Sequence, residues 1–223
     1  MQFSFLVQLA SALSIAAQGN FSSKSRLVES AKEHFNYLYL CGDYHLGPKT
    51  LATVFPVVNL VFMYDRLGGM CPREFLDEHT DENGRFIYPQ EEGFLLNATG
   101  APIKRNIILP VGTLVDRFGG EVNACLSPAF APYIQRAIPP INLNPPCTPI
   151  TPPAGRTLFT NNYNLYNVTR KIEVIAGPIA PAFGQPGRGT QYKTSEDVAT
   201  LVDEGFLQRL YPEDLVGRIT MYL

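Results

Sequence analysis

Three separated stretches in the second half of the chain carry side chains suited to binding an anion. Arg117 precedes a Gly-Gly turn, Arg136 begins the run Arg-Ala-Ile-Pro-Pro, and residues 177–192 are rich in glycine and proline. Guanidinium groups bind phosphate oxygens through paired N–H donors, and glycines let backbone N–H groups approach an anion closely. A single arginine is more often part of a salt bridge, and a single glycine loop is more often a plain turn. Together the three stretches favour a phosphate-binding site.

Several common active sites are excluded by the residues that are missing. The three histidines all lie in the first half of the chain and none is within four residues of another, which excludes a helical HExxH zinc site. The sequence has neither a GxSxG nucleophile motif nor a P-loop. Between residues 119 and 194 the only carboxylates are Glu121 and Glu173, so a glycosidase with two carboxylates is poorly supported. The net charge of −2 predicts no binding of nucleic acid, and we expect no metal site.

The elements around these stretches predict an α+β fold. Residues 113–118 are typical of a strand, and residues 163–176 of a long strand or hairpin. Residues 139–155 contain seven prolines and predict an irregular surface loop. Residues 194–197 resemble a capping box before a helix that we expect to stop at Gly205. We therefore expect a mainly antiparallel β-sheet core with short helices and long loops rich in proline and glycine.

The first half of the chain gives weaker signals. Apolar spacing predicts a short helix over residues 27–35, and Pro72 predicts a helical turn over residues 72–77. Residues 37–41 and 86–88 are short strand candidates.

The N-terminus predicts a secreted protein. Residues 3–17 are almost entirely apolar or small and too short to cross a bilayer, so we expect residues 1–17 to be a signal peptide. The alternative is a buried N-terminal helix. Sequons at Asn20, Asn97 and Asn167 predict glycosylation. No later segment is apolar enough to span a membrane, so we expect an extracellular or cell-surface protein.

The four cysteines contain no CxxC pair, which argues against zinc or thioredoxin-like chemistry. In a secreted chain disulfides are the usual outcome. We expect Cys41 to pair with Cys71, which would stabilise the fold by roughly 3–4 kcal/mol on the chain-entropy model. Cys125 and Cys147 could also pair.

The order of the motifs resembles one known family. Asp116-Arg-Phe-Gly, Arg136-Ala-Ile-Pro-Pro and the run from Phe183 to Tyr192 resemble the tuberculosis necrotizing toxin domain, and most closely its fungal secreted NAD glycohydrolases. Leu40-Cys-Gly-Asp and the segment from Gly69 to Asp77 extend the resemblance upstream. Both contain one of the first two cysteines, so the resemblance also supports the Cys41–Cys71 disulfide.

The resemblance implies an activity and roles for particular residues. Members of this family hydrolyse NAD to nicotinamide and ADP-ribose, so NAD is the substrate and no cofactor is expected. Gln191 would lie beside the nicotinamide ribose as a catalytic residue together with Arg117, and both Arg117 and Arg136 would bind the pyrophosphate. The remaining residues expected to bind substrate are Phe118, Cys125, Gly189 and Tyr192. The fungal relatives also imply a homodimer.

The chain departs from the fungal pattern at two positions. Cys125 and Ala182 stand where these relatives carry aromatic residues that help to pack the nicotinamide end. The alternative function is therefore a catalytically weak or inactive nucleotide-binding relative. A third reading, an ADP-ribosyltransferase, lacks the usual catalytic glutamate near the last motif. We expect residues 18–105 to form an N-terminal region and residues 106–223 the catalytic domain.

Overall fold

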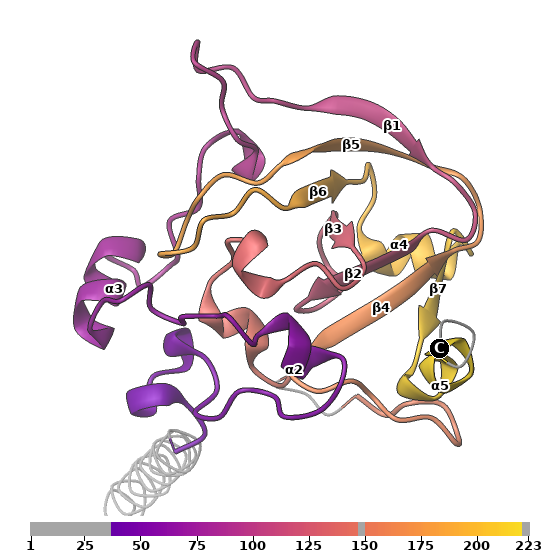
Figure 1. Ribbon diagram of the computed structural model, residues 1–223, viewed down its shortest axis with the longest axis horizontal. Helices are drawn as coiled ribbons and strands as arrows, with labels where there is room; N and C mark the ends of the chain where they lie inside the picture. The colour runs from indigo at the N-terminus through magenta and orange to yellow at the C-terminus, as the bar shows by residue number, and fades with distance from the viewer. Residues whose placement is uncertain (1–36, 147–149, 220–223) are drawn as a thin grey trace, which may run out of the picture.

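The computed structural model of the protein describes residues 37–146 and 150–219, which fold around one curved β-sheet (Figure 1). The sheet has seven strands in the order β1-β5-β6-β3-β2-β4-β7, and every neighbouring pair is antiparallel. The strands are β1 (Arg105–Leu109), β2 (Leu114–Phe118), β3 (Cys125–Pro128), β4 (Tyr163–Val168), β5 (Ile172–Pro178), β6 (Thr190–Lys193) and β7 (Leu207–Leu210). The α-helices are α2 (Val57–Leu60), α3 (Pro72–His79), α4 (Val198–Asp203) and α5 (Pro212–Ile219). The predicted α+β fold with a mainly antiparallel sheet is confirmed.

Strand β4 is buried on both faces. Successive side chains in a strand point to opposite sides, and each side of β4 packs into an apolar cluster. Tyr163 and Leu165 join an apolar cluster that includes the buried residues of α2. Tyr166 and Val168 join a second cluster that includes the buried residues of α4. The sheet therefore lies between two apolar layers, and its middle strands are held on both sides.

Strand β2 is paired on both edges, as β4 is, and it places polar side chains in the protein interior. It pairs with β3 on one edge and with β4 on the other. By strand alternation Val115 and Arg117 point to one face, and Asp116 and Phe118 point to the other. All four are buried. A strand fixed in this way can position charged groups with little freedom to move.

The stretch from 163 to 176 is not a hairpin, which corrects one of the two predicted forms. It forms β4 and β5, but β4 pairs with β2 and β7, whereas β5 pairs with β1 and β6. Figure 1 shows β5 beside β1 and β6, separated from β4. Both edges of β4 are already occupied, so the chain has to leave it and enter the other half of the sheet.

The predicted helix near residue 198 is confirmed, but its N-cap is Asp197 instead of Thr194. The Asp197 carboxylate accepts a hydrogen bond from the backbone N–H of Thr200 at 2.8 Å. Thr194 instead donates its hydroxyl to the Glu196 carbonyl at 2.6 Å. Asp fills the cap position as readily as Thr because its side-chain oxygen reaches the same free N–H groups. Gly205 has a φ of 74°, which suits the expected stop.

In the first half, the helix predicted to begin at Pro72 is present and extends to His79. The strand predicted over residues 37–41 is wrong. Only Tyr39 makes a β-bridge, to Pro48, and residues from Leu40 onward form a tight 3-10 turn. Cys41 has a φ of 51°, a left-handed conformation that a strand cannot contain. Similarly, residues 86–88 contribute a single bridge at Phe86.

The expected Cys41–Cys71 disulfide is not formed in this structure. Both thiols are free and exposed. Cys41 lies in the 3-10 turn, while Cys71 is the N-cap residue of α3 and donates its backbone N–H to the Glu74 carboxylate at 3.4 Å. Each cysteine is thus fixed by its own local turn, and a bridge requires the two Cβ atoms to approach within roughly 4.5 Å. Cys147 lies outside the described residues, so the Cys125–Cys147 pairing stays a prediction.

Other N-terminal predictions also fall outside the described residues, namely the signal peptide at 1–17, the sequon at Asn20 and the helix at 27–35. The division at residue 105 stays a prediction, although contacts cross it. The Gln185 side chain donates to the Asp65 carbonyl at 2.6 Å, and Phe94 bridges to Ile179. No helix in the described part of the chain is both long and apolar enough to cross a membrane.

Candidate active site

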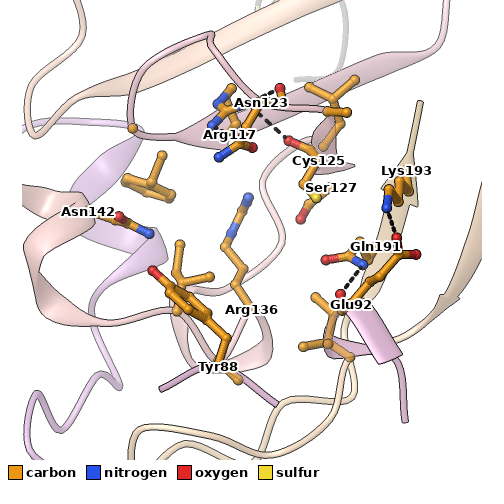
Figure 2. Close-up of a pocket in the computed structure, with 18 of the residues that line it drawn as sticks. Tyr88, Glu92, Arg117, Asn123, Cys125, Ser127, Arg136, Asn142, Gln191 and Lys193 are labelled. Atoms are coloured by element: carbon orange, nitrogen blue, oxygen red, sulfur yellow. Dashed lines mark hydrogen bonds and ion pairs between the residues drawn. The ribbon is translucent and has the colours of Figure 1, made fainter. Parts of the chain in front are cut away.

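One pocket of about 660 Å³ opens over the ends of β2, β3 and β6. Its volume falls within the range of about 300–1,000 Å³ that is usual for small-molecule sites. The two arginines singled out in the sequence and Gln191 all line this pocket, on different sides of it, as Figure 2 shows. The polar residues that line it are Glu92, Asp116, Arg117, Asn123, Ser127, Arg136, Asn142, Gln191 and Lys193, and the aromatic ones are Tyr88 and Phe118.

Arg117 is a buried cation without a carboxylate partner. Its guanidinium donates to the Asn123 carbonyl at 2.8 Å, to the Asn123 side chain at 3.3 Å and to the Cys125 carbonyl at 3.4 Å. Its Nε is buried without a hydrogen-bond partner among the described residues, and none of their carboxylates forms an ion pair with it. Burial lowers the pKa of Arg117 from its ordinary value. The Glu121 carboxylate also acts on this cation, but it is paired with Arg209. A buried charge that forms no ion pair of its own is costly, so this site is suited to receive an anion.

Arg136 is buried as well, but its guanidinium is already occupied. Nη1 and Nη2 donate to the two oxygens of Asp116 at 2.6 and 2.8 Å, and Nε and Nη2 donate to the Ala131 carbonyl. The same cation lies 5.2 Å from the centre of the Phe118 ring. Most of its donors are therefore committed inside the protein. Arg136 lines the pocket, but its first structural task is to neutralise Asp116.

Asp116 is the centre of this buried network. One of its oxygens also accepts from the Tyr163 hydroxyl at 2.7 Å and from the Phe130 backbone N–H at 2.8 Å. Burial, followed by the nearby Asp116 charge, raises the pKa of Tyr163 well above its usual range. The protein itself thus supplies four hydrogen bonds to this buried carboxylate. The carboxylate positions Arg136, Phe118 and the start of the pocket.

Gln191 lies on β6 at another wall of the pocket. Its Nε2 donates to the backbone carbonyl of Glu92 at 3.1 Å, and its Oε1 accepts no hydrogen bond from the described residues. The carboxylate of Glu92 forms an ion pair with Lys193, which is two residues along β6 on the same face as Gln191. Figure 2 shows Glu92, Gln191 and Lys193 grouped together, apart from Arg117 and Asn123.

Cys125 contributes a thiol and not a thiolate. Burial raises its pKa above the ordinary value, although the nearby Arg117 charge lowers it in part. A nucleophilic cysteine needs a lowered pKa. Cys125 is thus a small apolar part of the wall, and its carbonyl serves as an acceptor for Arg117.

The pocket brings together five of the seven residues predicted from the sequence, namely Arg117, Phe118, Cys125, Arg136 and Gln191. Tyr192 and Gly189 do not line it. Tyr192 follows Gln191 in β6, so its side chain points to the opposite face and packs on the apolar cluster around α4. Gly189 lies against the backbone of Gln135, where an added Cβ would stand 2.6 Å from the carbonyl oxygen. Tyr192 and Gly189 therefore contribute to the packing of the fold and not to the pocket wall.

Ala182 also lies away from the pocket lining, in a turn where it bridges to Gln185. The missing aromatic side chain at this position therefore removes no wall of the pocket as described. Aromatic walls come instead from Phe118 and from Tyr88, which packs edge-on against Phe183 at 5.4 Å between ring centres. Burial raises the pKa of Tyr88.

The sequence did not point to Tyr88, Glu92 or Lys193. Tyr88 and Glu92 come from the first half of the chain, far from the motif-bearing stretches. The one signal available for Lys193 was its period-two spacing from Gln191 in a strand. For Glu92 no local signal exists, because its place depends on the bridge between Phe94 and Ile179.

Comparisons with known proteins agree on one family. Residues 108–210 match the family model described as "Tuberculosis necrotizing toxin". The chain is 44% identical over 178 residues to the conidial surface nicotinamide adenine dinucleotide glycohydrolase nadA of Aspergillus fumigatus, a match that covers 78% of this chain and 72% of the fungal protein. Among solved structures it is similar to the tuberculosis necrotizing toxin in complex with its immunity factor, with a TM-score of 0.50 and 17% identity, over 74% of this chain and 94% of the toxin chain. This last match supports the fold alone.

Proposed function

This chain belongs to the tuberculosis necrotizing toxin family, and we propose that it is a secreted NAD glycohydrolase that cleaves the bond between nicotinamide and ribose. The observation that carries this proposal is the buried guanidinium of Arg117, which lines the pocket, forms no ion pair with a described carboxylate and keeps a free Nε. NAD contains a pyrophosphate, which is the kind of anion that a guanidinium binds best. The related fungal protein is named as a nicotinamide adenine dinucleotide glycohydrolase.

The reaction needs little acid–base chemistry from the protein. Water adds to C1′ of the ribose, the C1′–N bond breaks, and its electron pair returns to the ring nitrogen of nicotinamide. The ring is a cation in NAD, so it leaves as a neutral molecule without being protonated. One proton is released from the water, and the products are nicotinamide and ADP-ribose. The enzyme has to bind the dinucleotide, stabilise a positively charged ribose and place the water.

Gln191 is suited to placing that water. Its Nε2 is held by the Glu92 carbonyl, so the amide plane is fixed and the free Oε1 can accept a hydrogen bond from water or from a ribose hydroxyl. Arg117 would meanwhile contact the pyrophosphate. Arg136 would support this contact from within the Asp116 network and give it at most one remaining N–H.

Secretion and modification belong to the same proposal. The related fungal protein is described as a conidial surface protein, and the apolar residues 1–17 are suited to direct export. Asn97 is exposed at the start of a turn, where its side-chain oxygen accepts hydrogen bonds from Thr99 and Ala101. Asn167 lies inside β4 with strands on both sides, so Asn97 is the better acceptor. In an oxidising compartment Cys41 and Cys71 would be open to oxidation, since both are exposed.

The experiment that tests the activity is chromatography of NAD after incubation with the purified secreted chain. We expect nicotinamide and ADP-ribose to appear in equal amounts.

The competing candidate is a relative that binds nucleotides without cleaving them, and Cys125 in place of an aromatic wall residue is the observation that motivates it. Tight ADP-ribose binding with no release of nicotinamide at high protein concentration would establish that candidate and reject ours. Radiolabelled ADP-ribose attached to protein would indicate a transferase.

A further inference from the structure

Glu92 brings a carboxylate to a pocket whose own motif-bearing stretches supply none that is free. Its Oε1 pairs with Lys193, while its Oε2 makes only a long contact of 4.0 Å, with Lys104. The other carboxylate in the lining, that of Asp116, is saturated by Arg136, Tyr163 and a backbone N–H. Within the described lining, Glu92 is thus the carboxylate with an oxygen still available to a ligand.

The turn that carries Glu92 is held in an unusual conformation. Glu91 and Glu92 have φ values of 51° and 59°, and residues other than glycine rarely adopt this left-handed region. The neighbouring chain keeps the turn in place, because Ala180 N–H donates to the Gly93 carbonyl at 2.9 Å and Leu95 N–H donates to the Pro178 carbonyl at 2.8 Å. Strain that is maintained by its surroundings is concentrated at functional sites.

The two ends of the pocket therefore present different charges to a ligand. The Arg117 end carries a cation that forms no ion pair among the described residues, and the other end carries the Glu92–Lys193 ion pair beside Gln191, with one Glu92 oxygen bound only by a long contact; Figure 2 shows these two groups apart. NAD carries the complementary charges, with an anionic pyrophosphate in the middle and a cationic nicotinamide ring at one terminus. Opposite charges favour a single direction of binding.

We propose that the Glu92 carboxylate faces the cationic nicotinamide riboside of NAD and stabilises the positive charge as it moves onto the ribose. This inference rests on the proposed NAD glycohydrolase function and adds to it the direction of binding and a substrate-facing acid. As the C1′–N bond breaks, the charge passes from the ring to C1′ and its ring oxygen, which remain beside Gln191. A fixed carboxylate there lowers the energy of the transition state. The ion pair with Lys193 keeps the carboxylate in place.

The test separates charge from shape with Glu92→Gln. For NAD turnover we expect kcat/KM to fall at least about tenfold, while ADP-ribose, which lacks the cationic ring, binds with unchanged affinity. Glu173→Gln is the matched control, because Glu173 is an exposed carboxylate on β5 outside the pocket. Unchanged turnover in Glu92→Gln would overturn the proposal.

A second variant separates the carboxylate from the turn. Glu92→Gly accepts the left-handed conformation without strain and keeps the backbone carbonyl that holds Gln191. We expect it to lose as much activity as Glu92→Gln. Full activity in Glu92→Gly would show that the carbonyl suffices, and the carboxylate would then have no part in the reaction.

A binding measurement keeps this test independent of turnover. In a Gln191→Ala background, NAD and its reduced form NADH differ at the nicotinamide by one positive charge. We expect NAD to bind about three- to tenfold more tightly than NADH, and Glu92→Gln to remove this preference. If the protein with Gln191 intact cleaves no NAD but this preference is found, the glycohydrolase function fails and the direction of binding stands. If NAD is cleaved but no preference is found, the reverse holds.

Discussion

The guanidinium of Arg136 holds both carboxylate oxygens of Asp116 in a buried two-point contact, with N–O distances of 2.6 and 2.8 Å. Arg117 follows Asp116 in β2 and points to the other face of that strand. It forms no ion pair with a carboxylate of the described chain. Two arginines that look alike in the sequence therefore have different tasks. Arg136 maintains the structure of the pocket, and Arg117 is left to bind.

Asp116→Asn is expected to destabilise the protein by about 3–5 kcal/mol, because it leaves the buried Arg136 cation without its counter-ion. Urea unfolding measures this change. The matched control is Asp77→Asn, which breaks an exposed helical ion pair with Arg73 and should cost less than about 1 kcal/mol. Equal costs for the two variants would mean that the buried pair contributes no more than a surface pair.

Arg117→Gln is expected to weaken ADP-ribose binding by roughly 10- to 150-fold, which corresponds to the loss of charge-assisted hydrogen bonds to phosphate. Isothermal titration with ADP-ribose gives the affinity. Arg105→Gln, at an exposed arginine of β1, should leave it unchanged. If Arg117→Gln binds as tightly as the unaltered chain, the anion lies elsewhere.

Gln191→Ala is expected to reduce NAD turnover by at least about 100-fold while the fold and ADP-ribose affinity are preserved, because the side chain is half-exposed and packs little. Nicotinamide release is measured by chromatography and the fold by circular dichroism. Gln208→Ala, on the exposed side of β7, is the control. Undiminished turnover in Gln191→Ala would remove Gln191 from the mechanism.

Gly189→Ala is expected to destabilise the protein by about 1–3 kcal/mol, since the new Cβ would overlap the Gln135 carbonyl at 2.6 Å. Thermal unfolding measures the effect. Gly120→Ala is a suitable control, because nothing lies within 4 Å of the added atom there. A Gly189→Ala variant with normal stability but weakened NAD binding would restore the ligand-binding role that the sequence suggested.

Acidification is expected to destabilise the protein through His79. Burial lowers the pKa of His79 below its ordinary value of 6.5, and the Glu78 carboxylate, 3.9 Å away, opposes this shift only in part. The His79 Nε2 has no hydrogen-bond partner among the described residues. The folded protein thus favours the neutral ring, whereas the unfolded chain takes up a proton as the pH falls below about 6.5. Stability from this source is complete above that pH and is lost as the pH falls toward the folded pKa.

The measurement is urea unfolding at pH 7.5 and at pH 5.5 for the unaltered chain and for His79→Phe. The phenyl ring suits the site, because His79 packs against Phe75 and Phe183. We expect the variant to lose less stability on acidification. An identical loss in both proteins would show that His79 does not contribute to the pH dependence.

The sequence determined which kind of protein this is. Ordered motifs around Arg117, Arg136 and Gln191 identified the family, and strand alternation predicted an antiparallel sheet. Alternation within a strand also fixes which residues share a face, so strand β6 places Gln191 with Lys193 and turns Tyr192 away, although the motif had grouped Tyr192 with the substrate-binding residues. These properties are local, because they depend on side chains a few residues apart.

Only the tertiary structure decided how the charges are divided within the pocket. Asp116 and Arg136 are 20 residues apart, and Glu92 and Gln191 are 99 residues apart, yet each pair is in contact. Whether an arginine forms an ion pair inside the protein or stays available to a ligand depends on which distant groups the fold brings within hydrogen-bond range. Burial then makes that difference large, since an unpaired charge is costly only where water is excluded. For that reason two arginines that the sequence does not distinguish have different roles: Arg117 is available to bind a ligand, and Arg136 maintains the structure.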